Sequence, residues 1–212
     1  MSPPFAIELL GSQHKREAFA CGVAPLDRYF REQVGQDVRR RATACYVARE
    51  IVTDVIAGYY TLAAGSVLLT RMPQTLSKKL PRYPDVPVAR LGRLAVGQKF
   101  QGRKLGAALL WDAIERAARS EVVVYGVVVN AKDGEAVAFY EHHGFITLSA
   151  ETRQLVLRWP IFAKAWLRNE SWAARGRCPV EAPVEGSTRP SAPDTRVHRR
   201  WAPDFAARDW WS

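Results

Sequence analysis

The 212-residue sequence has few of the residues that build disulfide frameworks and metal centres, with three cysteines and four histidines. Cys21, Cys45 and Cys178 are odd in number and widely separated, so their spacing indicates neither a set of disulfides nor a zinc site. We therefore expect reduced thiols, no bound metal and a cytoplasmic protein.

Long apolar runs are also missing. The longest, residues 122–129, contains a glycine and is much shorter than the ~20 residues of a membrane-spanning helix. The first residues show no basic region followed by an apolar stretch, so no signal peptide is expected. Apolar residues still make up 48% of the chain, which is enough for a packed core. The sequence thus predicts a folded protein without a membrane partner.

Acidic residues are scarce relative to basic ones, since 21 Asp and Glu against 31 Lys and Arg give a net charge of +10. Seven of these bases and six of these acids lie beyond residue 168, so 24 bases and 15 acids remain in residues 1–168. A basic folded surface favours a polyanionic partner through counterion release and electrostatic steering. Solubility alone would explain the charge equally simply.

Periodicity and turn residues predict alternating strands and helices along residues 1–168. Strands are expected at 5–10, 43–49, 55–69, 88–96, 125–129, 145–148 and 153–158. Helices are expected from 21–27 to 39–41, at 104–120, at 134–143 and, shorter, at 161–167. This interleaving predicts an α/β domain with a mixed sheet. Gly65 is expected to mark a bulge or bend in its strand, and Gly144 to end the preceding helix.

Two proline-containing segments interrupt the pattern. Residues 70–87 carry four prolines among basic residues and predict a long loop with at most one helical turn. Residues 169–212 are polar, rich in arginine and proline, and without periodicity. They predict a largely disordered tail after a domain of residues 1–168.

A glycine-containing turn lies between a predicted strand and a long helix, with the sequence Gln101-Gly-Arg-Lys-Leu-Gly106. Glycines let a ligand approach the backbone closely, and free N–H groups at a helix N-terminus bind phosphates. Gly102 and Gly106 would allow that approach, while Arg103 and Lys104 would add positive charge. A pyrophosphate site is one interpretation, and a tight strand-to-helix turn without a ligand explains the spacing as well.

This turn, together with Arg93-Leu-Ala-Val before it and Ala138-Phe-Tyr-Glu-His-His-Gly-Phe after it, resembles the GNAT family of N-acetyltransferases. The family signature reads Arg/Gln-x-x-Gly-x-Gly/Ala; Gln101 and Gly106 match it, and Lys104 occupies the place of its first glycine. The resemblance implies a GNAT-like mixed central sheet with a splayed parallel strand pair, helices on both faces, and acetyl-CoA as co-substrate. It implies a cofactor site at Leu94, Ala95, Val96, Gln101, Gly102, Arg103, Lys104, Leu105, Gly106, Ala107, Asn130 and Phe139.

The resemblance also implies a catalytic tyrosine at Tyr140, because GNAT enzymes often carry one on the helix after the second splayed strand. A phenol within reach of a departing thiolate can donate the proton that the thiolate needs. The alternative is an aromatic side chain that only packs between helix and sheet. No carboxylate stands out as a general base, and an α-amino acceptor with a pKa of ~7.7–8.0 needs little help to become neutral. His142 and His143 are expected at an exposed helix end.

Four further segments resemble the GNAT toxins of bacterial toxin–antitoxin modules, at residues 19–30, 58–62, 79–87 and 91–96. This second resemblance covers residues 5–158. It implies acetylation of the α-amino group of aminoacyl-tRNA and an arrest of translation. It also implies a ribbon-helix-helix antitoxin, operator DNA bound only through the toxin–antitoxin complex, and a possible homodimer.

The proline-containing loop and the strand after it are strongly basic, with six Lys and Arg against Asp85 between residues 71 and 93. Such a cluster would hold the phosphates of a tRNA acceptor stem without reading its sequence. The cluster consists of Arg71, Lys78, Lys79, Arg82, Arg90 and Arg93. A solvated loop with scattered charge is the simpler alternative. A GNAT acting on a small amine or a protein N-terminus, and a non-catalytic binding module, are the competing functions.

Overall fold

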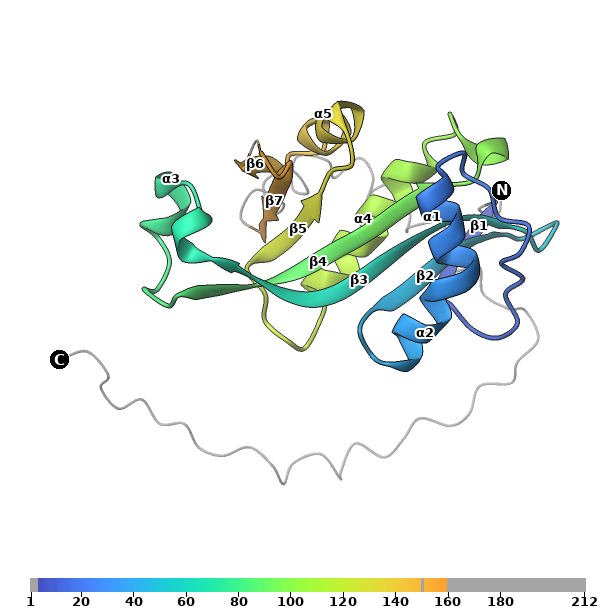
Figure 1. The fold of residues 1–212 in the computed structure, drawn as a ribbon, viewed down its shortest axis with the longest axis horizontal. Helices are drawn as coiled ribbons and strands as arrows, with labels where there is room; N and C mark the ends of the chain where they lie inside the picture. Colours follow the sequence, from blue (N-terminus) through green and yellow to red (C-terminus); the bar gives the residue numbers. More distant parts are fainter. Residues whose placement is uncertain (1–3, 150, 160–212) are drawn as a thin grey trace, which may run out of the picture. The chain divides into compact units, whose positions relative to one another are not determined.

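The computed structural model describes residues 4–149 and 151–159, and these residues form one seven-stranded sheet with the order β1-β2-β3-β4-β5-β7-β6 (Figure 1). The strands are β1 (Phe5–Leu9), β2 (Ala44–Glu50), β3 (Ile56–Leu68), β4 (Asp85–Val96), β5 (Gly126–Asn130), β6 (Ile146–Ser149) and β7 (Gln154–Arg158). Neighbouring strands run antiparallel except β4 and β5, which are parallel. The predicted mixed α/β architecture is confirmed. The helix expected at 161–167 and the tail expected from 169 lie outside the described residues.

Helices cover both faces of the sheet, as predicted (Figure 1). On one face, α1 (Ala24–Arg28) continues through a π-helical turn (Tyr29–Gln33) into α2 (Val34–Arg39), and the short α3 (Gln74–Ser77) covers the other end. The opposite face is covered by α4 (Leu105–Ala118) and α5 (Gly134–His142). Burial explains this arrangement, since α4 places Leu105, Leu109, Leu110, Ala113, Ile114 and Ala117 against the sheet.

The two parallel strands pair over three residues only and then separate. Ala89–Leu91 of β4 pairs with Val127–Val129 of β5, and no later residue of β4 pairs with β5 among the described residues. The expected splay of the parallel strands is therefore present, and it opens beside Leu94 and Val96.

A β-bulge lies in β4 immediately before the strands separate. Thr61 of β3 pairs with Arg93 and Leu62 pairs with Leu91, so Gly92 is left without a partner. The Arg93 N–H donates a hydrogen bond to Thr61 Oγ1 at 3.0 Å. Of the bulge or bend predicted at Gly65, the bulge is not found there, because Gly65 pairs with Val88 in an unbroken register.

The segment between β3 and β4 is shorter than predicted. A 3-10 turn (Leu69–Arg71) and α3 occupy its first part, and β4 begins at Asp85 rather than at Val88. Pro87 is accommodated in the strand because its carbonyl accepts from Tyr125 N–H at 2.8 Å. The nitrogen and the carbonyl of one strand residue point to the same side, so the ring nitrogen of Pro87 also faces away from β3. No hydrogen bond to β3 is lost, and on the other side β5 begins only at Gly126.

A polar network with one fully buried member, Tyr60, joins α4 to the sheet. The Tyr60 hydroxyl donates a hydrogen bond to Asp112 Oδ2. Arg116 Nε donates to the same oxygen at 2.7 Å. The Arg116 guanidinium also lies 4.3 Å from the centre of the Tyr46 ring. Tyr60 is fully buried, and burial is the main cause of the raised pKa of its hydroxyl. The Asp112 carboxylate is thus the acceptor for the fully buried Tyr60 hydroxyl and for the half-buried Arg116 guanidinium.

Asp112→Ala is expected to lower the free energy of unfolding by about 2 kcal/mol, because it leaves the buried Tyr60 hydroxyl without an acceptor. Glu115→Ala on the same helix is the matched control. It removes the exposed ion pair with Arg119, which is worth only ~0.3–0.5 kcal/mol. Urea denaturation of the two variants measures the difference, and equal losses would contradict a structural role for the network.

Candidate active site

The loop between β4 and α4 has the geometry of an anion site. A 3-10 turn (Gln98–Phe100) leads into it, and Gly102 adopts a left-handed φ of +74°. The first helical hydrogen bond of α4 runs from Ala108 N–H to the Lys104 carbonyl at 3.2 Å. The N–H groups of residues 105–107 precede this bond and point out of the helix end, where they can bind a phosphate.

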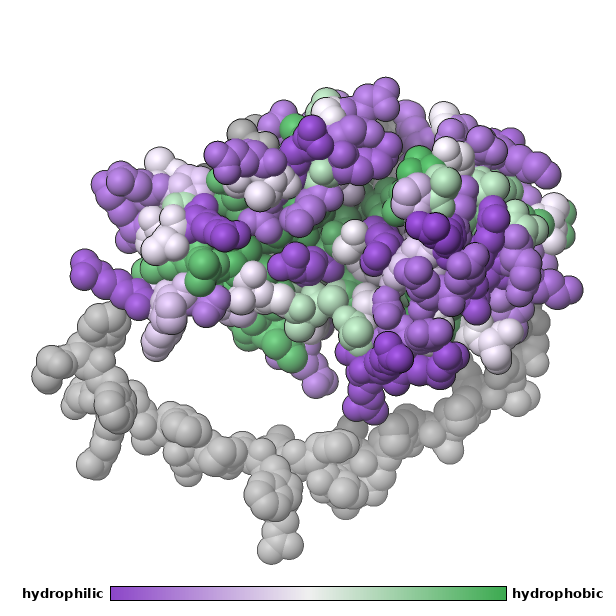
Figure 2. Space-filling model, in the orientation of Figure 1, coloured by the Kyte–Doolittle hydropathy of each residue, from purple (hydrophilic) through white to green (hydrophobic). Residues whose placement is uncertain are grey.

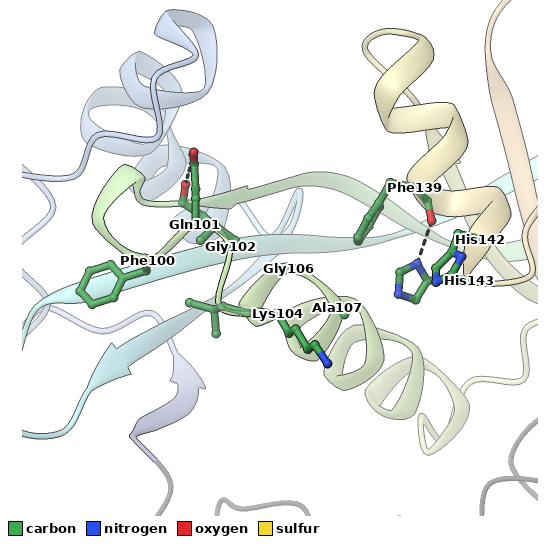
Figure 3. Close-up of a pocket in the computed structure, with 11 residues that line it drawn as sticks. Phe100, Gln101, Gly102, Lys104, Gly106, Ala107, Phe139, His142 and His143 are labelled. Carbon is green, nitrogen blue, oxygen red and sulfur yellow. Dashed lines mark hydrogen bonds between the residues drawn. The ribbon is translucent and has the colours of Figure 1, made fainter.

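A cleft of about 560 Å³ lies between this loop and α5 (Figure 3). Its size is in the range of small-molecule and cofactor sites. A methyl group built on Gly106 would lie 3.7 Å from Val96 and 4.0 Å from Phe139, so a larger residue there would enter the cleft. The lining residues are Val96, Phe100, Gln101, Gly102, Lys104, Leu105, Gly106, Ala107, Phe139, His142 and His143.

Gln101 fixes the loop in place. Its side-chain Nε2 donates to the carbonyl of Val96 at 3.1 Å, drawn in Figure 3, and to the carbonyl of Cys21 at 2.9 Å. The amide therefore ties the end of β4 and the segment before α1 to the loop. Its role in the site is to hold the backbone of the loop, while its side-chain donors are already used within the protein.

The end of β4 turns backbone groups toward the opening between the parallel strands. Gly97 N–H donates to the Ala57 carbonyl at 2.8 Å, so Gly97 and, two residues earlier, Ala95 face β3. The backbone groups of Leu94 and Val96 consequently face away from β3, toward the opening. An extended ligand can form sheet-like hydrogen bonds with the Leu94 backbone and the Val96 N–H, whereas the Val96 carbonyl already accepts from Gln101. Both residues belong to the cofactor site expected from the sequence.

Tyr140 lies on α5 beside the cleft but does not line it. It packs with Leu94 and Val96 against the apolar cluster under α4, and its ring centre is 5.3 Å from that of Phe145. Within the described part of the chain its hydroxyl forms no hydrogen bond. Burial raises the pKa of Tyr140 to about 12. The phenol is therefore protonated near neutral pH and is a proton donor without a partner of its own.

The ends of α5 fix the position of this tyrosine. Asp133 Oδ1 accepts a hydrogen bond from Ala136 N–H at 2.8 Å and caps the start of the helix. Gly144 adopts a left-handed φ of +88° and ends it, as predicted.

The bulge at Gly92 brings two arginines to one face of the sheet. Residues 90 and 93 would point to opposite faces of a regular strand, since side chains alternate. With one extra residue between them, both face the side covered by α1 and α3. Arg90 lies over Gly65, and the Arg93 guanidinium lies 3.4 Å from the centre of the Tyr29 ring. The Tyr29 hydroxyl donates to Asp37 at 2.9 Å, so Arg93 rests on a fixed aromatic surface.

The other four predicted basic residues are exposed around α3 on the same side of the sheet. Among the described residues, none of the six forms an ion pair with a carboxylate. Figure 2 shows this face with apolar surface across its middle and hydrophilic side chains on both sides, over α3 and over α1 and α2. The six are Arg71, Lys78, Lys79, Arg82, Arg90 and Arg93.

Residues 81–159 match the acetyltransferase (GNAT) domain family. The tRNA-acetylating toxin of Mycobacterium tuberculosis is 34% identical over 142 residues, which cover 66% of this chain and 83% of that toxin. The chain belongs to the GNAT family of acetyltransferases.

Solved structures agree with this assignment. AtaT complexed with acetyl-methionyl-tRNAfMet is 26% identical, with a TM-score of 0.70 over 76% of this chain and 99% of AtaT. AtaTR bound with acetyl-CoA is also 26% identical, with a TM-score of 0.66 over 77% of this chain and 98% of that one. A tyrosine-to-phenylalanine mutant of AtaT bound to the C-terminus of the antitoxin AtaR is 24% identical, with a TM-score of 0.65 over 77% of this chain and 99% of that one, which shows the shared fold.

As a GNAT enzyme the protein is an N-acetyltransferase that uses acetyl-CoA. The loop, the start of α4 and the free edge of β4 fit the pyrophosphate and the extended arm of this co-substrate. Among the described residues, no group of three or more His, Cys, Asp or Glu is placed to hold a metal ion. No helix among them is long and apolar enough to cross a membrane.

The cleft brings together eight of the predicted cofactor residues and leaves four outside it. Ala95 is buried against the opposite face of the sheet, and Leu94 packs against the apolar cluster under α4. The Arg103 guanidinium is 5.6 Å from the centre of the Phe100 ring. Asn130 accepts from Gln154 at 3.2 Å. The backbone of Leu94 remains available at the strand opening, whereas the side chains of the other three have different neighbours.

Three lining residues were not predicted as part of the site. These are Phe100, His142 and His143. Helical spacing could have predicted the two histidines as lining residues. They follow Phe139 by three and four residues, so they lie on the same face of the helix. His143 confirms this placement, since its ring centre is 4.6 Å from that of Phe139 and its Nδ1 is 2.7 Å from the Phe139 carbonyl. Phe100 directly precedes the glycine turn and carried no distinct signal.

Proposed function

We propose that this protein transfers the acetyl group of acetyl-CoA to the α-amino group of aminoacyl-tRNA and thereby stops translation. The observation that carries the proposal is the basic face beside the strand opening, to which the bulge at Gly92 brings both Arg90 and Arg93. The tRNA-acetylating relative and the AtaT complex with acetyl-methionyl-tRNAfMet support the same acceptor.

The acceptor approaches from the face opposite α4, in this proposal, and the acetyl donor from the side of α4 and α5. The neutral amine attacks the acetyl carbon, the new C–N bond forms, and the C–S bond breaks. The Tyr140 hydroxyl donates its proton to the departing thiolate, and the proton lost by the amine passes to water, which restores the phenol. The amide product has no nucleophilic nitrogen, so the acetylated aminoacyl-tRNA cannot accept a growing peptide.

The basic residues around α3 would hold the RNA through its phosphates. Lys78, Lys79 and Arg82 are exposed without carboxylate partners, so they are free to neutralise phosphates. Tyr83 is 70% exposed among them and offers a ring on which an unpaired base can stack. These contacts position the RNA and do not select its sequence.

We further propose that an antitoxin of the ribbon-helix-helix type neutralises the enzyme, and that operator DNA is bound only by their complex. A homodimer is part of this proposal. The AtaT structure with the C-terminus of AtaR supports an antitoxin partner, through a fold that this chain shares.

Salt dependence separates this acceptor from a small amine or a protein N-terminus. With aminoacyl-tRNA as substrate, KM should rise on the order of 20-fold between 50 and 200 mM salt if three phosphate contacts are made. The Kd of acetyl-CoA, measured over the same range, is the control for the donor site. A KM for aminoacyl-tRNA that is no more salt-dependent than this Kd would favour an acceptor without phosphates.

A further inference from the structure

Lys104 adopts a backbone conformation that glycine favours. Its φ of 60° and ψ of 10° are left-handed, at the residue that precedes the first turn of α4. A side chain makes this conformation costly, whereas glycine adopts it freely. The GNAT signature has glycine at this place, and Lys104 here adopts a backbone conformation that glycine would adopt without cost. Non-glycine residues in this region cluster at active sites and ligand sites, where the strain serves function.

The side chain of Lys104 is exposed and lines the cleft. Figure 3 shows the Lys104 side chain extending along the start of α4. His142 and His143 project into the cleft from α5. Within the described residues the Lys104 ammonium has no carboxylate within ion-pair distance. Glu141, the nearest acid in sequence to the two histidines, accepts from Thr147 at 2.9 Å instead. The cleft therefore has an unpaired cation at the end where the helix N–H groups converge.

We propose that the Lys104 ammonium binds a phosphate group of coenzyme A directly, in addition to the backbone donors of the loop. In this proposal, the lysine costs more free energy than glycine would in the left-handed conformation, but it adds a cation that binds the ligand. The proposal depends on the use of acetyl-CoA and is independent of the acceptor amine, so its test needs no tRNA.

Three substitutions separate the charge of Lys104 from its backbone conformation. Lys104→Met removes the charge and keeps a Cβ, Lys104→Gly removes both the charge and the strain, and Lys104→Arg keeps the charge. Calorimetric titration with acetyl-CoA at low salt should show binding about tenfold weaker for the first two and within about threefold of the parent for the third. Lys104→Gly should have a higher Tm than Lys104→Met although both bind weakly.

Lys99→Met is the matched control, because Lys99 is exposed on the 3-10 turn before the loop and does not line the cleft. It should bind acetyl-CoA like the parent protein. Glycine or methionine variants that bind as tightly as the parent would overturn the proposal. So would an equal loss in the control, which would indicate a general effect of surface charge.

Two analogues test whether the lysine acts on phosphate. With S-acetylpantetheine, which has no phosphate, Lys104→Met and the parent should bind equally, and a persisting difference would overturn the proposal. With dephospho-coenzyme A, which lacks only the 3′-phosphate, a persisting tenfold difference assigns Lys104 to the pyrophosphate. A difference that disappears assigns it to the 3′-phosphate, and both results support direct phosphate binding.

Discussion

Tyr140→Phe is expected to lower kcat by about 10²–10³-fold, because it removes the proton that the departing thiolate would receive. The phenyl ring keeps the contacts with Phe139 and Phe145, so folding and the Kd of acetyl-CoA should change little. The measurement is steady-state release of free coenzyme A with aminoacyl-tRNA as acceptor, alongside calorimetric binding of acetyl-CoA.

Tyr125→Phe is the matched control for this substitution. The Tyr125 hydroxyl is buried, and like that of Tyr140 it has no hydrogen-bond partner in the described structure. Its removal should leave kcat within about twofold of the parent. A Tyr140→Phe enzyme with near-normal kcat would show that Tyr140 only packs between α5 and the sheet.

The raised pKa of Tyr140 predicts that the amine alone sets the pH dependence of the reaction near neutral pH. A pKa of about 12 keeps the phenol protonated, and hence able to donate, throughout pH 6–10. The amine acts in its deprotonated form, so kcat/KM should rise with pH until the α-amino group is neutral, near its pKa of ~7.7–8.0, and then stay level. A fall in kcat/KM between pH 8 and 10 in the parent, absent from Tyr140→Phe, would place the pKa of Tyr140 much lower.

The triple substitution Lys78→Gln, Lys79→Gln and Arg82→Gln is expected to lower kcat/KM for aminoacyl-tRNA on the order of 10²-fold at low salt. Each residue neutralises one phosphate in the proposal, so the slope of log KM against log salt should decrease by roughly 2–3. Because all three side chains are exposed, Tm should be almost unchanged.

A second triple variant on another exposed basic segment controls for net charge. Arg39, Arg40 and Arg41 end α2 and are exposed, and their replacement by glutamine removes the same charge. If both variants lower kcat/KM equally, the effect comes from overall charge, and the segment around α3 has no special part in RNA binding. A strong effect confined to the residues around α3 supports the proposed contact.

Local patterns were sufficient to predict most elements of the fold. Alternation identified the strands, the amphipathic stretch after the glycine turn identified α4, and Gly144 marked the end of α5. These signals lie within single segments, which explains why they can be read before any pairing is known. The resemblance to GNAT enzymes added the splayed strand pair, which no single segment contains.

The features that were missed depend on how segments pair. The bulge at Gly92 exists only through the register of β3 against β4, and nothing in the sequence distinguishes Gly92 from Gly65 as its position. Its consequence, Arg90 and Arg93 on one face, could not be derived from alternation. The early start of β4 depends on the direction in which Pro87 faces, which is likewise a property of the sheet.

The site shows the same division between local and tertiary information. Glycine spacing located the phosphate loop. The left-handed conformation of Lys104 could not be predicted from the sequence, because lysine rarely adopts it. The cleft wall at His142 and His143 depends on how α5 lies against α4. Helical spacing from Phe139 would have placed the two histidines on the correct face once the orientation of that helix was known.

The most direct test of the proposed function is the chemical identity of the product. Purified protein is incubated with acetyl-CoA and fully aminoacylated total tRNA, the RNA is digested with ribonuclease, and the 3′-terminal nucleosides are analysed by mass spectrometry. The proposal predicts N-acetyl-aminoacyl-adenosine, absent when the tRNA is deacylated beforehand and strongly reduced with Tyr140→Phe. Unmodified aminoacyl-adenosine alone, from a protein that binds acetyl-CoA, would contradict aminoacyl-tRNA as the acceptor.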